Sequence, residues 1–435
     1  MGRESPGDVW RASNLTSGVR AFVLGIFILA LAISATLAAS GLAGAAQAKL
    51  RKSPSADRGT ISPAIATGAF GLDLLRAQPP GNVVLSPDSV VAALAMTGMG
   101  GVGRTAGEIA RTLHLKGPAR FAAVGDLQRR IAARQVTAAA GKPEPPKLAI
   151  ANGLFLRQGL PFETGFLARA ERHFGATPET VDFAGDPAGA LDAINGWVSD
   201  GTEGLVPRIL DSLPEKMALA NAVYLDADWR HPFEQRETRP GVFRRAGGKT
   251  RVDFMRQTER LRYGAGPGYR AVALPYRSST LSLLVVLPAG QRLGSLQRRL
   301  SGRGLARIAR RLSPRPVILS LPRFHLKTEA ELTGSLKKLG MPTAFTDAAN
   351  FSRITAAAPL KIDFVRHAAD LTVDEKGTVA AAVTVVGAVQ FSGPVRPRDA
   401  VTFNANRPFL FFLRDDSTGA VLFAGRVTNP ASPGR

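Results

Sequence analysis

The chain has 435 residues, of which 45% are hydrophobic and 21% are charged, so it is long enough to bury a sizeable core. It contains no cysteine, which excludes disulfides, thiolate metal sites and thiol catalysis. The 56 lysines and arginines outnumber the 34 aspartates and glutamates, and the net charge of +22 favours anionic partners such as acidic polysaccharide or another polyanion.

The N-terminal segment predicts export. Residues 21–48 carry no charge, and they end in Ala-Gln-Ala, which fits the small-x-small rule of signal peptidase. We therefore predict a signal peptide over residues 1–48, a secreted or extracytoplasmic protein, and a flexible lead-in over residues 49–64. The alternative is a membrane anchor retained through residues 21–45, because about 20 apolar residues span a bilayer.

The rest of the chain predicts mixed α and β structure. Helical spacing of apolar residues predicts helices, and short apolar runs bounded by proline, glycine or charged turns predict buried strands. In chain order, the predicted elements are a helix over 89–96, a helix that begins near 105, a helix over 189–198, strands over 281–287 and 317–321, a helix over 330–339, and strands over 409–413 and 420–424.

No catalytic motif is found in the sequence. Residues 98–105 satisfy the spacing of a phosphate-binding loop, but arginine replaces the lysine and the preceding segment predicts a helix. The five histidines show no HExxH spacing, and no G-x-S-x-G motif occurs. No aromatic platform accompanies the basic residues, so a specific nucleic-acid partner is not expected. We predict a protein that is not an enzyme and needs no metal or other cofactor.

The most informative stretch is the strand-like run Asp374–Val386. In an extended chain, the alternate positions from Thr378 to Thr384 share one uniformly small face. Small side chains suit a segment that must slide between paired strands, because overpacking a dense interior costs about 1–3 kcal/mol. Gly377 gives the backbone freedom of a hinge, and the glycines and prolines of residues 387–398 favour a loop that a protease can reach. The alternative is an ordinary sheet strand.

Several blocks of the sequence resemble the serpin family of serine protease inhibitors. The run that begins at Asp374 is similar to the proximal hinge of the serpin reactive-centre loop. The further blocks match in the family's order: residues 82–89, 152–155, 220–225 with Trp229, Pro232 and Phe233, then 401–412 and 423–430. The resemblance spans residues 65–430.

The resemblance implies an α+β serpin fold. It predicts a single domain over residues 65–430, with a large central, mainly antiparallel β-sheet, further sheets and about eight or nine helices. It also predicts an exposed reactive-centre loop over about 375–402, with residues 431–435 as a tail. The expected state is a monomer with a liability to polymerise through loop insertion between molecules.

The activity that the resemblance implies is suicide inhibition of a serine protease. The protease attacks a bait bond and forms a covalent acyl complex, and the hinge then inserts as a central strand before deacylation. Counting from Glu375 as in most inhibitory serpins places the bait bond at Phe391-Ser392, and phenylalanine suits a chymotrypsin-like protease. Trypsin-like targeting competes with this assignment, but Arg396 precedes proline and Arg398 would require a longer loop.

The resemblance also implies which residues carry the mechanism. The hinge comprises Glu375, Gly377, Thr378, Ala380, Ala381 and Ala382. A hydrogen-bonded cluster beneath the strands that part comprises Ser86, Ser89, Asn195 and His367. The contacts at the top of the hinge come from Arg323, which pairs with Glu375, and from Trp229.

Departures from the family pattern keep an alternative open. Val379 stands where glutamate is common, Val383 stands where a small residue is common, and residues 391–403 form a longer segment than in many members. The alternative is a non-inhibitory serpin that acts as a carrier or as a polyanion-binding surface protein. The hinge favours the inhibitor, because no bulky, charged or proline residue interrupts residues 377–386.

Overall fold

The computed structural model describes residues 62–139, 146–176, 178–202, 204, 206–290, 292–379 and 399–432. The chain divides into two units, Met1–Ala56 and Asp57–Arg435, and every described residue belongs to the second. The predicted leader, nearly all of the lead-in and residues 380–398 lie outside the described residues. Within the described ranges, no helix is long and apolar enough to cross a membrane.

The described residues contain nine α-helices and two short 3₁₀ helices. The α-helices are α1 (Pro63–Ala77), α2 (Pro87–Gly100), α3 (Gly103–Thr112), α4 (Ala122–Ala139), α5 (Thr164–Phe174), α6 (Pro187–Gly201), α7 (Leu293–Arg299), α8 (Gly302–Arg311) and α9 (Thr333–Leu339). The 3₁₀ helices are η1 (Gln235–Glu237) and η2 (Thr343–Phe345).

The strands alternate with these helices along the chain. They are β1 (Val83–Leu85), β2 (Lys147–Arg157), β3 (Glu179–Val181), β4 (Met217–Asp228), β5 (Arg239–Arg245), β6 (Gly248–Gly266), β7 (Tyr269–Pro275), β8 (Leu281–Pro288), β9 (Ser313–Pro322), β10 (Phe324–Glu331), β11 (Phe364–Val373), β12 (Gly377–Val379), β13 (Val401–Asn404), β14 (Phe409–Asp415) and β15 (Val421–Val427).

Local sequence chemistry sets where several helices begin. The side chain of Ser86 caps α2 and that of Asp186 caps α6, and in both helices proline occupies the first turn, where no backbone donor is needed. The hydroxyl of Ser301 accepts a hydrogen bond from the backbone nitrogen of Gly304 at 3.1 Å and caps α8 in the same way. Serine, aspartate and proline at these positions therefore mark the helix starts in the sequence itself.

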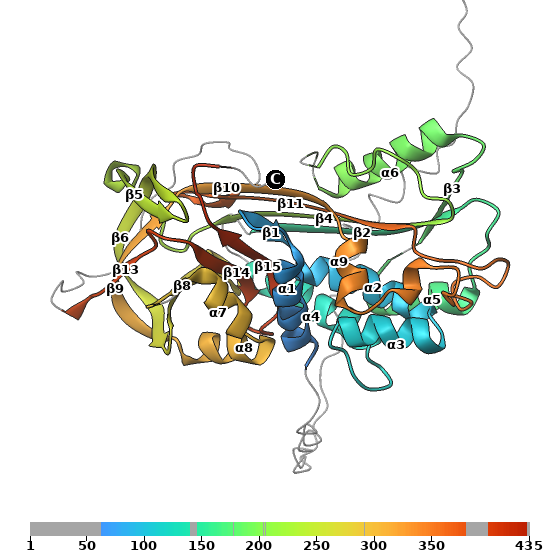
Figure 1. The fold of residues 1–435 in the computed structure, drawn as a ribbon, viewed down its shortest axis with the longest axis horizontal. Helices are drawn as coiled ribbons and strands as arrows, with labels where there is room; N and C mark the ends of the chain where they lie inside the picture. The colour runs from blue at the N-terminus through green and yellow to red at the C-terminus, as the bar shows by residue number, and fades with distance from the viewer. Residues whose placement is uncertain are drawn as a thin grey trace, which may run out of the picture. The chain divides into compact units, whose positions relative to one another are not determined.

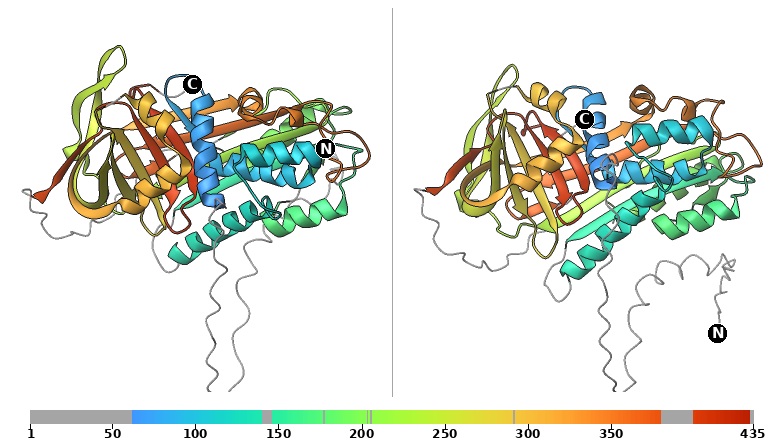
Figure 2. Two further views of the ribbon diagram at one scale, coloured as in Figure 1. Left: turned by 60° about the horizontal axis from the view of Figure 1, so that its bottom comes forward. Right: turned by 90° about the horizontal axis from the view of Figure 1, so that it is seen from below.

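The central sheet has six strands in the order β10-β11-β12-β4-β2-β3. Its pairs are antiparallel except β2 with β3 and β11 with β4. Helix α6 lies on one side of this sheet, and α2 lies on the other side (Figure 1). The two further views in Figure 2 show the same arrangement of layers.

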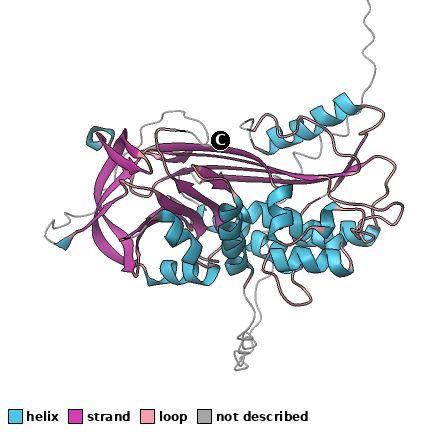
Figure 3. Ribbon diagram, in the orientation of Figure 1, coloured by secondary structure: helices cyan, strands magenta, loops and turns pink. Residues whose placement is uncertain are grey.

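The second sheet has nine strands, in the order β1-β15-β14-β8-β7-β6-β9-β13 with β5 paired to β6. Strands of this sheet gather at one end of the drawn ribbon, and most of the helices gather at the other (Figure 3). Strands β14 and β15 are buried along their whole length, so their apolar runs are nearly continuous instead of alternating with polar residues.

The sequence predictions of the elements are largely confirmed. Helices α2 and α6 and strands β8, β9, β14 and β15 form where the sequence predicts them, and the fold is α+β with a mainly antiparallel central sheet. The helix predicted over 330–339 begins only at Thr333, because Ala330 and Glu331 end β10 and pair with β11. Glu331 accepts a hydrogen bond from the backbone nitrogen of Thr333 at 2.8 Å, and this bond marks the change from strand to helix.

Candidate functional site

The central sheet contains a seam between β4 and β11. Along its lower part the two strands pair directly and in parallel, with Phe364–Ala369 opposite Ala218–Val223. Toward the end of β4 the strands part, and β12 lies between them. Thr378 is opposite Ala227 of β4 and Val373 of β11, and both pairings are antiparallel. The first residues of the predicted hinge thus already form a short central strand at the top of the seam.

A tight turn reverses the chain between β11 and β12. The carboxylate of Asp374 accepts hydrogen bonds from the backbone nitrogens of Lys376 at 2.9 Å and Gly377 at 3.1 Å. The backbone nitrogen of Asp374 donates to the carbonyl of Gly377 at 3.1 Å. Aspartate suits this position because its short side chain can satisfy backbone donors two and three residues ahead.

Glu375 is held at the top of the hinge by a basic partner. Its side chain is only 4% exposed, and Nε of Arg323 shares its one N–H between the two carboxylate oxygens, at 2.7 and 2.8 Å. Burial alone would raise the pKa of the Glu375 carboxyl, but hydrogen bonds from Arg323 and from Thr238 hold it below its ordinary value. The carboxylate therefore stays charged at neutral pH, and the turn is fixed against β9 and β10.

Trp229 and Tyr276 contact the Asp374 turn and the start of β12 from the side of β4. The indole nitrogen of Trp229 donates to the carbonyl of Asp374 at 2.8 Å, and its backbone nitrogen donates to the carbonyl of Lys376 at 2.7 Å. The ring of Trp229 stacks on Tyr276 with centroids 4.5 Å apart. The hydroxyls of Tyr276 and Thr378 are 2.6 Å apart in the interior, so the side chain of Thr378 points inward.

Gly377 allows β12 to approach β4 closely. A Cβ atom at this position would lie 2.0 Å from the carbonyl oxygen of Ala227, a distance that no real side chain can tolerate. Glycine is therefore required at this position by packing as well as by the predicted freedom of a hinge, because only a residue without Cβ fits beside the backbone of β4.

A polar cluster lies beneath the seam. Because the backbone nitrogen of Ser86 donates to Nε2 of His367 at 3.1 Å, Nε2 carries no proton, and Nδ1 donates to Oδ1 of Asn221 at 2.7 Å. The Asn221 amide nitrogen in turn donates to the hydroxyl of Ser89 and to the side-chain oxygen of Asn152. We call these five residues the polar cluster. His367 and Asn221 stand opposite each other across the seam, so their hydrogen bond ties its two strands together.

The prediction that Asn195 belongs to this cluster is wrong. Its side chain instead accepts hydrogen bonds from the backbone nitrogens of Ile209 and Leu210, both at 2.9 Å, and donates to the carbonyl of Leu210 at 3.0 Å. Asn195 lies on α6, on the other side of the sheet, where it anchors the segment that leads to β4. An asparagine can satisfy three backbone groups of a loop in this way, and a local backbone partner outcompetes a distant side chain.

Sequence reasoning missed two members of the polar cluster. Asn221 and Asn152 both stand within the blocks that carry the family resemblance, at residues 220–225 and 152–155. Asn221 lies on the largely buried strand β4, and Asn152 directly precedes the buried residues 153–156 of β2, so a polar amide at either position would be costly without a partner. A search for asparagine inside apolar strands would have found them. The predicted residues Ala380, Ala381, Ala382, Phe391 and Ser392 lie outside the described residues.

Two buried titratable groups have opposite effects on stability near α2. Burial lowers the pKa of His367 to about 4. Burial raises the pKa of Asp88 to about 7, although Gln128 donates a hydrogen bond to its carboxyl at 3.3 Å. Between pH 5 and 7, acidification protonates the histidine of the unfolded chain and so favours unfolding. Over the same range it protonates Asp88 in the folded state and so favours folding.

Single variants of Asp88 and His367 should show opposite dependences of thermal stability on pH. Asp88→Asn should leave a chain whose thermal unfolding temperature falls as the pH is lowered from 7 to 5, and His367→Gln should leave one whose unfolding temperature rises. Each effect corresponds to about 2 kcal/mol over this range, and they largely cancel in the unaltered protein. Differential scanning calorimetry at three pH values measures the slopes, and slopes of the same sign in both variants would contradict the assignment.

A second prediction concerns the seat of β12. Gly377→Ala should push β12 out of the seam, because the added Cβ collides with the backbone of β4. Hydrogen exchange at Thr378 and Val379 should then become fast, while exchange along β10 stays slow. Lys376→Ala is the matched control, since the Lys376 side chain lies in the adjacent turn and is only partly buried. Unchanged protection in Gly377→Ala would show that the two strands tolerate a side chain there.

Comparison with known proteins places this geometry in context. The family model described as Serpin (serine protease inhibitor) matches residues 66–430. An uncharacterised serpin-like protein of Thermococcus kodakarensis is 32% identical over 84% of this chain and 85% of its own length. The leukocyte elastase inhibitor of Equus caballus is 31% identical over 83% of this chain and 97% of its own length.

Solved structures agree with the sequence matches. The native state of tengpin, a thermophilic serpin, is 27% identical, with a TM-score of 0.71 over 84% of this chain and 94% of its own. Protease nexin-1 with heparin has a TM-score of 0.71, and thyroxine-binding globulin with thyroxine has one of 0.70; each is 26% identical over 85% of this chain and 99% of its own. The match of the family model over most of the chain and the shared fold lead to one conclusion: the chain belongs to the serpin family.

Proposed function

We propose that this serpin inhibits a serine protease by inserting its own reactive-centre loop into the seam. The observation that carries the proposal is the position of β12, which lies between β4 and β11 and pairs with both in the antiparallel sense. Below it the same two strands touch each other directly. Because β12 already pairs with both strands at one end of the seam, the residues that follow it could pair with β4 and β11 along the rest of the seam once the loop is cut.

The register of β12 says where each later residue would go. Each step along the hinge moves one residue back along β4 and one back along β11, so Thr384 would come to lie between Asn221 and His367. Insertion must therefore break the hydrogen bond that joins these two residues across the seam. Thr384 is on the same small face as Thr378, so its hydroxyl would point toward the polar cluster and replace the lost partner.

The same register supports the bait bond at Phe391-Ser392. Strand β11 begins at Phe364, which would be opposite Gly387, so the sheet ends four residues before Phe391. A protease acylated at Phe391 would then be drawn to the far end of the sheet on a short tether. A bond at Arg398 would leave a much longer tether and a weaker pull on the protease.

The target protease would carry out the bond-breaking step of the inhibition. Its serine oxygen bonds to the carbonyl carbon of Phe391, the bond to the nitrogen of Ser392 breaks, and the serine proton passes to that nitrogen. Residues 392–435 become a separate chain that stays in place, because this segment contains the buried strands β14 and β15. Insertion replaces the parallel β4–β11 pairing by two antiparallel ladders, and each added hydrogen bond contributes about 0.5–1.5 kcal/mol. The native fold is thus a kinetically trapped state. Once its strands have parted, the same seam would accept the loop of a second molecule, which would produce polymers.

The proposal predicts a covalent complex with a chymotrypsin-like protease. Residues 49–435 incubated with chymotrypsin should give a band on a denaturing gel that contains both proteins, and mass spectrometry should find a released peptide that begins at Ser392. Phe391→Arg should transfer complex formation from chymotrypsin to trypsin, because the residue before the cut fills the specificity pocket. Thr384→Arg is the control that should turn the protein into a plain substrate. Cleavage without a complex across chymotrypsin-, trypsin- and elastase-like proteases would favour the carrier alternative.

A polyanion is the second partner that the surface supports. Arg303, Arg307, Arg310 and Arg311 of α8 are all exposed, and their spacing puts them on one face of the helix. One of the similar structures bears on such a role, because protease nexin-1 was solved with heparin. We propose that α8 presents a basic stripe to an acidic polysaccharide, with no specific nucleic acid involved.

Heparin-agarose chromatography tests the basic stripe. Replacing Arg303, Arg307 and Arg311 by alanine should lower the salt concentration needed for elution well below that of the unaltered protein, because fewer cations contact the polymer. The Arg129→Ala and Arg130→Ala pair on α4 is the control, and Arg129 is already bound to Asp126 at 2.7 Å. Equal losses in both variants would mean that only the total charge matters.

We further propose that residues 1–48 are an export signal and that residues 49–64 link it to the serpin domain. The support is the uncharged run that ends in Ala-Gln-Ala. Expression in a secreting host should yield a product whose first residue is Lys49, as read by Edman degradation. A product that stays in the membrane fraction with its leader intact would support the anchor through residues 21–45 instead.

A further inference from the structure

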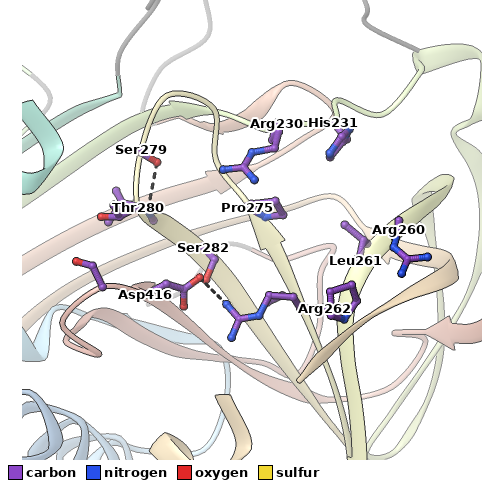
Figure 4. Close-up of a pocket in the computed structure, with 14 residues that line it drawn as sticks. Arg230, His231, Arg260, Leu261, Arg262, Pro275, Ser279, Thr280, Ser282 and Asp416 are labelled. Atoms are coloured by element: carbon purple, nitrogen blue, oxygen red, sulfur yellow. Dashed lines mark hydrogen bonds and ion pairs between the residues drawn. The ribbon is translucent and has the colours of Figure 1, made fainter. Parts of the chain in front are cut away.

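A cavity of about 550 Å³ lies among β6, β7, β8 and the turn that joins β14 to β15 (Figure 4). This volume is within the range of small-molecule sites in proteins, about 300–1,000 Å³. One part of the wall is apolar and is formed by Leu261, Ala273, Pro275 and Leu281. The remaining wall carries arginines and hydroxyl groups. The cavity therefore offers both an apolar surface and charged donors, which is the combination that binds small polar organic molecules.

The arginines of the cavity are unevenly compensated. Arg262 already has a carboxylate partner, because it donates to Asp416 at 2.9 Å, and it also donates to the carbonyl of Ala309 at 2.9 Å. Arg230 and Arg260 are exposed, and within the described ranges neither guanidinium has an ion-pair or hydrogen-bond partner. His231 is near Glu259, at 3.9 Å. Two guanidinium groups at one cavity thus lack a carboxylate partner there.

A buried hydroxyl at the same wall also lacks a partner. Ser282 is 1% exposed, and its Oγ makes no hydrogen bond within the described residues. The neighbouring hydroxyls differ, since Thr280 donates to Asp415 and Ser417 donates to both of its carboxylate oxygens, at 2.9 and 2.7 Å. A buried polar group without a partner costs about 1–3 kcal/mol, so an acceptor atom brought by a ligand would relieve that cost.

We propose that this cavity binds a small organic anion, with its apolar body against Leu261, Ala273 and Leu281 and its carboxylate, sulfonate or phosphate group held by Arg230 and Arg260. Guanidinium groups bind such oxyanions through paired N–H donors, which makes the contact both strong and directional. The hydroxyl of Ser282 would donate a further hydrogen bond to the ligand. The site involves neither the hinge nor the basic stripe of α8, so it stands apart from protease inhibition.

Titration calorimetry of the purified full chain with 1-naphthyl phosphate tests the site, with uncharged 1-naphthol as the matched ligand. Naphthyl phosphate should bind with saturation, and naphthol should bind at least tenfold more weakly. Arg230→Gln and Arg260→Gln should each weaken phosphate binding about tenfold, because each removes a charged hydrogen-bond donor. Arg256→Gln is the control, since Arg256 is an exposed arginine of the same strand β6 that does not line the cavity.

A variant of Ser282 separates binding from folding. Ser282→Ala should weaken naphthyl phosphate binding severalfold without lowering the thermal unfolding temperature, because the hydroxyl has no partner to lose in the unliganded protein. The proposal is overturned if naphthyl phosphate shows no saturable binding or binds no better than naphthol. It is also overturned if Arg256→Gln loses as much affinity as the two cavity arginine variants, since that result would indicate attraction by overall charge alone.

Discussion

The structure depends on one constraint in its central sheet: β4 and β11 pair with each other along most of the seam and with β12 at its top. An antiparallel insertion can replace this parallel pairing, because the inserted chain supplies hydrogen-bond partners for both neighbours once they have moved apart by one strand spacing, about 4.8 Å. Several groups around the seam stabilise this strand pairing. The Asp374 turn and the Glu375–Arg323 pair fix the upper end, and the polar cluster ties the strands below.

The seam is held closed by the parallel β4–β11 ladder and by the polar cluster, and the proposed insertion would replace that ladder by the backbone hydrogen bonds of two antiparallel ladders. The bond between His367 and Asn221 is buried, and both partners would be left unsatisfied if the strands simply separated. Under the proposed mechanism, a hydroxyl that arrives with the loop would restore a partner at that level, so the opening of the seam would be coupled to insertion.

Much of this arrangement could be predicted from the sequence, and the reasons differ between elements. Capped helices such as α6 and continuous apolar strands such as β14 carry strong local signals, and the hinge run shows its small face through simple alternation. The helix start at Thr333 could not be predicted, because the pairing of Ala330 with His367 is a long-range property that overrides local periodicity. The assignment of Asn195 failed for the same reason. The sequence predicts this polar role for Asn195, but only the fold decides that Asn221 is the asparagine that faces His367.

The most direct test of this account is hydrogen exchange on the protein after a single cut in its loop at residues 391–392. The account predicts that the amides of residues 380–387 become strongly protected, that β4 and β11 stay protected, and that thermal unfolding moves to a markedly higher temperature. Such a result would mean that the loop has inserted as a strand between β4 and β11. Rapid exchange at residues 380–387, together with an unchanged unfolding temperature, would contradict the central claim that the seam is built to accept the hinge.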